Sequence, residues 1–227
     1  MHQDEVFEAI RATVAAGEYL DWLPAAKAQG LRGGLAGTEP VRNAPGGYLR
    51  GTPEHLQARA TGLVARLPSP PVALPEAVLE LEEALGCLLP PLLRRLFLEV
   101  ANGGFGPRGR GILGVRGYEL TYIGDWTDLL HVYRAFSPGR PREMLWLFDW
   151  GCAIWSLVDC SHPEGQMWVW DPNGAADPSP SNSLFRQAMT LTDWLAAWLH
   201  GQLDLPRIAE DEIPGQLTLF DQTGTGQ

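Results

Sequence analysis

Cysteine is scarce in this chain of 227 residues, which contains only Cys87, Cys152 and Cys160. The number is odd and no two of them are spaced as C-x-x-C, so the sequence predicts neither a zinc knuckle nor a disulfide framework. The histidines are scattered, with no H-E-x-x-H motif and no paired metal spacing: His2, His55, His131, His162 and His200. We therefore expect reduced thiols, no bound metal and no cofactor.

Long hydrophobic runs are also missing. The longest apolar stretch, residues 85–98, is interrupted by two prolines and two arginines, which makes it too short and too charged to span a bilayer. The first eight residues include three acidic side chains, where a secretory signal needs positive charge followed by an apolar run. We expect a cytoplasmic protein that has no membrane partner.

Positive charge is in deficit, because 17 Lys and Arg residues stand against 27 Asp and Glu residues and give a net charge of −10. Proteins that bind nucleic acid directly place Lys and Arg on the phosphates, so this function class is excluded. An acidic surface speeds association with a basic protein, but the same charge also serves solubility alone. Composition leaves both interpretations open.

Catalytic signatures are absent as well, including the G-x-S-x-G motif of hydrolases. Gly104, Gly106 and Gly109 have the G-x-G-x-x-G spacing of a dinucleotide-binding loop. Such a loop must leave a strand and open a helix, so that the pyrophosphate lies at the helix N-terminus. Here helical sequence precedes the loop and strand-like sequence follows it. We interpret the loop as a helix end and a turn, and we expect no enzymatic activity.

The first third of the chain predicts helices separated by loops. Residues 5–16 place four apolar side chains on one helical face: Val6, Phe7, Ile10 and Val14. Residues 18–29 and 52–67 are typical of two further helices, with Gly- and Pro-rich sequence between them. We therefore predict a helical N-terminal extension over 1–67 and a Pro-rich linker over 68–75.

The remainder predicts a folded domain over 76–205 and a flexible acidic tail over 206–227. Two helices come first, one ended by Gly86 and the next beginning at Pro90 and Pro91. The other expected elements are strands at 112–115, 119–123, 144–151, 153–160 and 166–172, a short helix at 128–136, and a last helix capped by Thr192. The predicted class is α+β, with a central antiparallel sheet of about four to six strands flanked by helices.

Ordered motifs in the domain resemble the SMI1/KNR4 family, also called the SUKH superfamily. The family's opening has a helical Glu, a Gly, Leu-Pro, a second helix and Asn-Gly-Gly. In this chain these correspond to Glu82, Gly86, Leu89-Pro90 and Asn102-Gly103-Gly104. The strand pair around Gly151-Cys152 and the helix that ends near Gly201 also look like the family's. The resemblance extends from about residue 74 to residue 201.

The resemblance implies a SUKH-like α+β domain and a function in protein binding. Bacterial members are largely immunity proteins that bind and neutralise a cognate toxin, often a nuclease. Fungal relatives are regulators that act through protein contacts. The expected partner is therefore a protein, and a basic toxin domain fits the acidic charge of this chain.

Acidic and aromatic residues near the expected strand ends are the candidates for partner binding. Asp149, Asp159 and Asp171 form either an acidic patch for a partner's Arg or Lys, or local caps of turns. Glu82 is either a solvated helix position or a polar group held against the Asn102-Gly103 turn. Trp150 adjoins the Gly151 turn, and we expect it to be an exposed anchor for the partner.

The tail contains a second candidate motif, "QLTLF" at residues 216–220. Gln216, Leu217, Leu219 and Phe220 are similar to the peptide by which bacterial DNA-maintenance proteins dock on the polymerase sliding clamp. The alternation of Leu217 and Leu219 equally permits a strand that folds back on the domain's own sheet edge. An interaction module that docks on the sliding clamp is therefore the alternative function.

Overall fold

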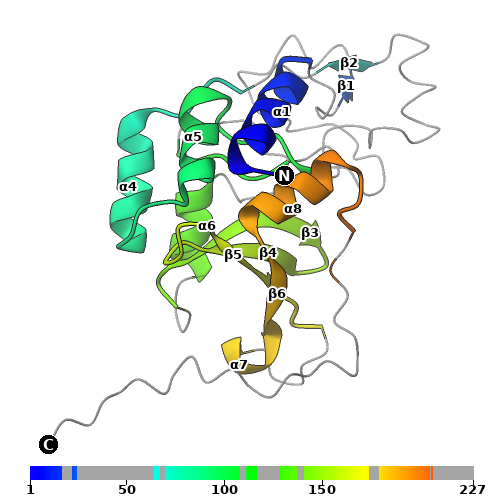
Figure 1. Cartoon of the computed structure of the whole chain (residues 1–227). Coiled ribbons are helices and arrows are strands. Elements are labelled where there is room, and N and C mark those ends of the chain that lie inside the picture. Colours follow the sequence, from blue (N-terminus) through cyan, green and yellow to red (C-terminus); the bar gives the residue numbers. More distant parts are fainter. Residues whose placement is uncertain are drawn as a thin grey trace, which may run out of the picture.

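The computed structural model describes residues 1–16, 22–24, 64–66, 70–107, 111–116, 128–136, 141–173, 179–204 and 206. Over these residues the chain forms helices and a four-stranded antiparallel sheet, which is the predicted α+β class (Figure 1). No helix among the described residues is long and apolar enough to cross a bilayer. The predicted domain boundaries at residues 67, 75 and 205 stay predictions.

The sheet consists of β3 (Met144–Gly151), β4 (Ile154–Asp159), β5 (Gln166–Trp170) and β6 (Leu184–Thr190), side by side in that order. The first three coincide with the aromatic, apolar runs of the sequence, because such residues suit strands buried on both faces. The sequence pattern does not predict β6. It is an edge strand with half-buried and exposed side chains, and its polar Arg186 and Gln187 break the apolar pattern.

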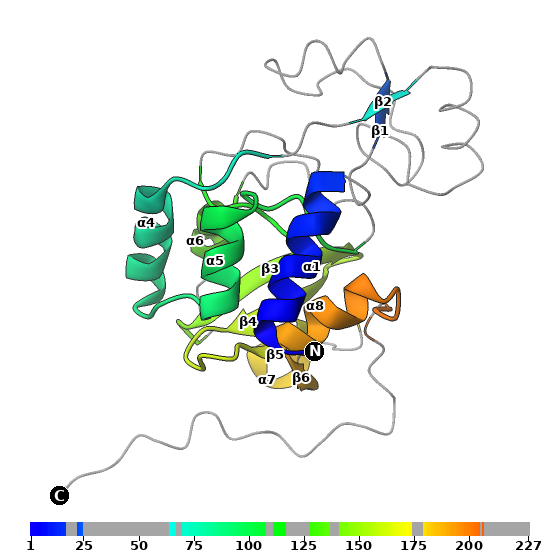
Figure 2. The same ribbon diagram turned by 45° about the horizontal axis from the view of Figure 1, so that its top comes forward.

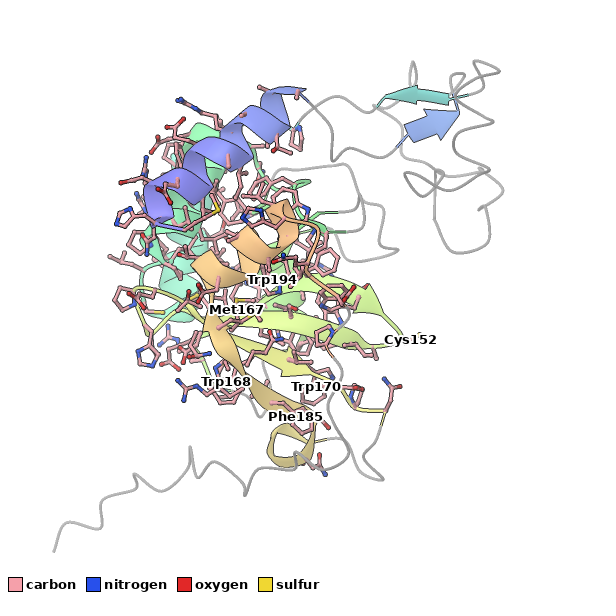
Figure 3. All side chains as sticks on the ribbon, turned by 45° about the vertical axis from the view of Figure 1, so that its right-hand side comes forward. Cys152, Met167, Trp168, Trp170, Phe185 and Trp194 are labelled. Carbon is pink, nitrogen blue, oxygen red and sulfur yellow. The ribbon has the colours of Figure 1, made fainter. Side chains whose placement is uncertain are left out.

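Cross-strand register gives the sheet two faces. The inner face carries Phe148 and Met167 and lies against α8 (Leu191–Leu199), where the Phe148 ring is 6.0 Å from that of Trp194 (Figure 3). The outer face carries Trp146, on which Phe136 stacks with ring centroids 4.9 Å apart. Aromatic side chains thus bury both faces of the sheet.

The remaining elements surround the sheet: α1 (Gln3–Ala16), α4 (Pro75–Leu85), α5 (Pro91–Glu99), α6 (Leu129–Phe136) and the short α7 (Pro180–Ser183). Helices α1, α5 and α8 lie together over the inner face of the sheet (Figure 2), and α6 contacts β3. Gly86 ends α4 and Pro91 begins α5, as the sequence predicts.

Helix α1 is part of the same core. All four of its predicted apolar side chains are buried, and the helix contacts α5 and α8. Arg95 of α5 donates a hydrogen bond to Asp4 at 2.8 Å, and its guanidinium lies 4.1 Å from the centre of the Phe7 ring. The N-terminal helix therefore packs on the domain.

The structure corrects the helices expected at 18–29 and 52–67. Trp22–Pro24 forms β1 and Val64–Arg66 forms β2, and the two short strands pair antiparallel. The backbone groups of each strand bond to the other strand, which is distant in the sequence. A helical pattern among neighbouring residues cannot predict such pairing. The rest of both segments lies outside the described residues.

Two further expectations in the domain are wrong. Residues 112–115 are not a strand, because their backbone bonds mostly to the preceding turn, and only Leu113 bonds to β3, at Leu147. The cap of α8 is Thr190 rather than Thr192. Thr190 is the cap because it and Asp193 form a capping box. The Asp193 carboxylate accepts a hydrogen bond from the Thr190 N–H, and Thr190 Oγ1 accepts one from the Asp193 N–H. The strand expected at 119–123 lies outside the described residues.

Candidate functional site

The Asn102-Gly103-Gly104 turn follows α5 and lies in close contact with the segment 111–116. The Asn102 side chain accepts from Val115 N at 2.7 Å and donates to Val115 O at 3.1 Å. A Cβ added at Gly103 would lie 2.5 Å from the Gly114 nitrogen, so only glycine permits this approach. These contacts hold the turn against the segment 111–116.

The same contacts decide the role of the glycine-rich loop. The Gly104 N–H donates to Ile112 O at 2.9 Å, so it is not available to a phosphate. The loop follows the C-terminal end of α5, whose carbonyl dipole repels anions. Gly106 also lies in this turn, whereas Gly109 lies outside the described residues. The interpretation as a helix end and turn holds for the described part.

Glu82 lies beneath the turn between α4 and α5, and both expectations for it are wrong. Its side chain is about 4 % exposed, and Oε1 accepts from Leu89 N and from Arg94 Nε, each at 3.1 Å. Because Leu89 precedes Pro90 at the start of α5, Glu82 fixes how the second helix follows the first. It is neither solvated nor held against Asn102.

The three aspartates all cap turns, as the second of the two interpretations predicts. Asp149 Oδ1 accepts from Gly151 N at 2.7 Å, and Asp171 Oδ1 accepts from Asn173 N at 3.0 Å. Asp159 Oδ1 accepts from Ser161 N at 2.9 Å at the opposite end of β4. The structure therefore brings Asp149 and Asp171 to one end of the sheet and leaves Asp159 at the other.

Trp150 is buried, so the exposure expected for it is wrong. Its Nε1 donates to Ser156 Oγ at 2.8 Å, and its ring packs edge-on against Phe148 at 4.9 Å. The register shifts between Trp146 and Phe148, and this bulge places Phe148, and with it Trp150 two residues later, on the inner face. A one-residue change of register is invisible in the sequence pattern.

Unlike Trp150, Trp170 is partly exposed to solvent at this end of the sheet. One row of the outer face crosses the four strands and consists of Asp149, Trp155, Trp170 and Leu184. Trp170 is half-buried, and its ring centre lies 5.7 Å from that of Trp146. The signal was available in "WVW", where alternation places Trp168 and Trp170 on one face.

The loop between β3 and β4 is tight. Gly151 pairs with Ile154, so Cys152 and Ala153 are the two central residues, with φ of 53° and 63°. Positive φ at both positions is the requirement of a type I′ turn, and it is costly for residues other than Gly and Asn. Asn173 Nδ2 also donates to Cys152 O at 2.9 Å. We call the set Asp149, Gly151, Cys152, Asp171 and Asn173 the hairpin end (Figure 3 labels Cys152 at its tip).

Replacing Cys152 with Asn and Ala153 with Gly is expected to stabilise the protein by about 1–2 kcal/mol, because these residues adopt positive φ at lower cost. The measurement is urea unfolding followed by tryptophan fluorescence. Cys152→Ala alone is the control and should leave stability almost unchanged, since it keeps the strain. An unchanged midpoint in the double variant would show that the turn is not strained.

Metal binding and thiol chemistry depend on how the described His, Cys, Asp and Glu side chains are placed. No three His, Cys, Asp or Glu side chains among the described residues converge as a metal site requires. Burial raises the pKa of the Cys160 thiol well above its ordinary value and also raises the pKa of Cys87, which disfavours a reactive thiolate at either position. The tail residues Gln216, Leu217, Leu219 and Phe220 lie outside the described residues.

Comparison with known proteins agrees with this arrangement. The sequence profile of the SMI1 / KNR4 family (SUKH-1) matches residues 73–197 of the 227. No curated protein and no solved structure matches the chain significantly. The matched range holds the Glu82 contact, the Asn102 turn, the whole sheet and most of α8. The chain belongs to the SMI1 / KNR4 family (SUKH-1).

Proposed function

We propose that this chain is a non-enzymatic immunity protein that binds and neutralises a cognate toxin through its hairpin end. Family membership is compatible with protein binding of this type. The observation that carries the proposal is the pair of carboxylates at that end, Asp149 and Asp171. Neither has a cationic partner among the described residues, and a half-buried tryptophan lies beside them.

The geometry suits an arginine or lysine of the partner. Asp149 and Trp170 flank Trp155 on the outer face, and Asp171 directly follows Trp170. A guanidinium that stacks on Trp170 can pair with a carboxylate at the same time, which combines a cation–π contact with a charge-assisted hydrogen bond. Of the five residues predicted to bind a partner, this interface keeps Asp149 and Asp171. It omits Glu82 and Trp150 because they are buried, and Asp159 because it lies at the other end.

The hairpin end is also held in place before any partner arrives. Both carboxylates are fixed by turn hydrogen bonds, and Asn173 ties its own loop to the β3–β4 turn. Side chains that are already ordered lose less conformational entropy on binding. The positive φ angles at Cys152 and Ala153 are strain of the kind that gathers at functional sites.

The partner that fits is a basic toxin domain such as a nuclease. A nuclease presents Lys and Arg where it holds the phosphates of its substrate. The net charge of −10 steers association with such a surface, and a protein seated over it blocks the substrate without any reaction. Sliding-clamp docking through the tail stays a prediction that a chain ending at Pro214 tests.

The test begins with co-expression of the full chain and candidate toxins from the same genome, scored by growth. The purified pair is then measured by calorimetry with Asp149→Asn/Asp171→Asn. Asparagine keeps the turn hydrogen bonds, so the fold should survive while affinity falls by at least about tenfold. Glu5→Gln/Glu164→Gln removes the same charge at exposed positions elsewhere and should leave affinity nearly unchanged.

A titration of toxin activity separates binding from catalysis. A protein that acts by occlusion must be present in one-to-one amount, whereas an enzyme protects at a small fraction of the toxin concentration. Protection at substoichiometric amounts would overturn the non-enzymatic proposal. If the Asp149→Asn/Asp171→Asn variant bound as tightly as the wild type, the interface would lie outside the hairpin end.

A further inference from the structure

Strand β6 lies at one edge of the four-stranded sheet. Its sheet neighbour is β5, and no strand among the described residues pairs with its other side. An edge strand presents backbone N–H and C=O groups with which a further strand can pair. The apolar side chains of β6 are only half-buried, namely Leu184, Phe185 and Met189 (Figure 3 labels Phe185). This edge therefore offers both backbone groups and apolar side chains to a docked strand.

The register with β5 shows which backbone groups of β6 point outward. Asp171 N donates to Ser183 O at 2.8 Å, so these two residues form a hydrogen-bonded pair. Such pairs alternate along antiparallel strands, and Phe185 therefore makes the next one with β5. The N–H and C=O groups of Leu184 and Arg186 then point away from β5, where an added strand can bond to them.

A bulge limits the length of edge that can pair. Between Arg186 and Thr190, β6 has two more residues than the part of β5 that faces it. Gln166 of β5 bonds to this bulge, because its Nε2 donates to Gln187 O at 2.6 Å. Regular pairing is therefore interrupted after Arg186, and the straight part of the edge, 184–186, suits a short peptide.

The chain carries a peptide of this kind in its tail. The motif "QLTLF", residues 216–220, contains no charged residue, and its Leu217 and Leu219 alternate with polar positions as in a half-buried strand. Threonine and phenylalanine, the other large residues of the motif, also favour strands. Pro214 and Gly215 come directly before it and are typical of a turn. The motif thus has the pattern and the boundary of a short strand.

The tail is long enough to reach this edge. Helix α8 directly follows β6 and contains nine residues, so it is about 14 Å long. Residues 200–215, which separate α8 from the motif, span up to about 50 Å when extended. A tethered peptide also has an effective concentration of about millimolar, which favours it over a second copy or another protein.

Residues 119–123 are strand-like in sequence too, but the described residues on either side of them lie near a different edge. Arg116, which precedes them, pairs with Glu80 of α4 at 2.9 Å. Helix α6, which follows them, contacts α4 and β3. This stretch therefore begins and ends on the β3 side of the sheet, and β6 is the opposite edge.

We infer that residues 216–220 pair with β6 as a fifth strand of the sheet. Leu217 and Leu219 take the two positions opposite Leu184 and Arg186 and exchange hydrogen bonds with their outward-pointing backbone groups. Residues opposite each other share a face of the sheet, so one of the two leucines extends the outer-face row that ends at Leu184. The inference goes beyond toxin binding and does not depend on it, because no residue of the hairpin end takes part.

Amide hydrogen exchange of the full chain, followed by NMR, tests the inference. The amides of Leu184 and Arg186 should exchange at least about tenfold more slowly in the wild type than in Leu217→Asp/Leu219→Asp, because the two carboxylates oppose docking against an apolar row. The amide of Phe185 bonds to β5 and should exchange at the same rate in both proteins.

Gln222→Asp/Thr223→Asp is the matched control, because it adds the same two negative charges just beyond the motif. This variant should keep the slow exchange of the wild type. Exchange measured at two protein concentrations tenfold apart should agree, because a strand supplied by the same chain pairs independently of concentration.

A nitroxide label placed just after the motif reports the position of the tail directly. The label is attached to Gln222→Cys in a Cys152→Ser background, and the same background without Gln222→Cys is treated identically as the control. The unpaired electron should broaden the amide signals of 184–186, and Leu217→Asp/Leu219→Asp should abolish this broadening.

Three results would overturn the inference. The first is fast exchange of the Leu184 and Arg186 amides in the wild type, or no broadening of their signals by the label. The second is slow exchange that survives in Leu217→Asp/Leu219→Asp, which would assign the edge to another segment. The third is slow exchange that increases with protein concentration, which would place a second copy of the chain at the edge.

Discussion

Replacing Gly103 with alanine is expected to destabilise the protein by at least about 3 kcal/mol. Its φ of 76° is in the left-handed region, where a side chain costs about 1–2 kcal/mol. The new Cβ would also lie 2.5 Å from Gly114 N and 2.8 Å from Ile112 O. Both neighbours are backbone atoms that cannot turn away, so the segment 111–116 must move. That movement strains the two hydrogen bonds between Asn102 and Val115, which contribute about 1 kcal/mol each.

Urea unfolding followed by tryptophan fluorescence measures this loss, with Gly201→Ala as the matched control. Gly201 also has a positive φ, of 66°, but a Cβ there would meet no atom within 4 Å. The control should therefore cost only the conformational strain, about 1–2 kcal/mol. Equal losses in the two variants would mean that the close approach of the two backbones contributes nothing.

The helices that the sequence predicts well are those whose apolar side chains repeat at helical spacing. The core contains all four predicted side chains of α1: Val6, Phe7, Ile10 and Val14. Helix α4 ends at Gly86 and α5 begins at Pro91, as expected. Such signals are local, because a helix bonds to itself and needs only one face buried. The failures at β1 and β2 are non-local, since each short strand depends on a partner about 40 residues away.

The candidate site was predictable only in outline, for a related reason. Aspartates at strand ends were visible as turn caps, but which of them share an end depends on strand order. Trp150 faces inward because of a single bulge, and Glu82 is buried because Leu89 and Arg94 come back to it from the next helix. Register and tertiary contacts of this kind leave no periodic signal in the sequence.

Replacing Glu82 with alanine is expected to cost about 2–3 kcal/mol. The Leu89 N–H is buried and would lose its acceptor, and an unpaired buried donor costs about 1–3 kcal/mol. The variant also leaves a small cavity beneath the turn between α4 and α5. Arg94 adds little to this loss, because its side chain is 39% exposed and water can replace the carboxylate.

Glu82→Gln separates the hydrogen bond from the charge and is measured by the same urea unfolding. Glutamine keeps an acceptor for Leu89 N and removes a charge whose second oxygen, Oε2, is buried without a hydrogen bond. We expect it to cost less than about 1 kcal/mol, because the desolvation penalty of the carboxylate disappears together with its attraction to Arg94. If glutamine cost as much as alanine, the ion pair with Arg94 would be the dominant contact. The acceptor for Leu89, which sets how α5 follows α4, would then be secondary.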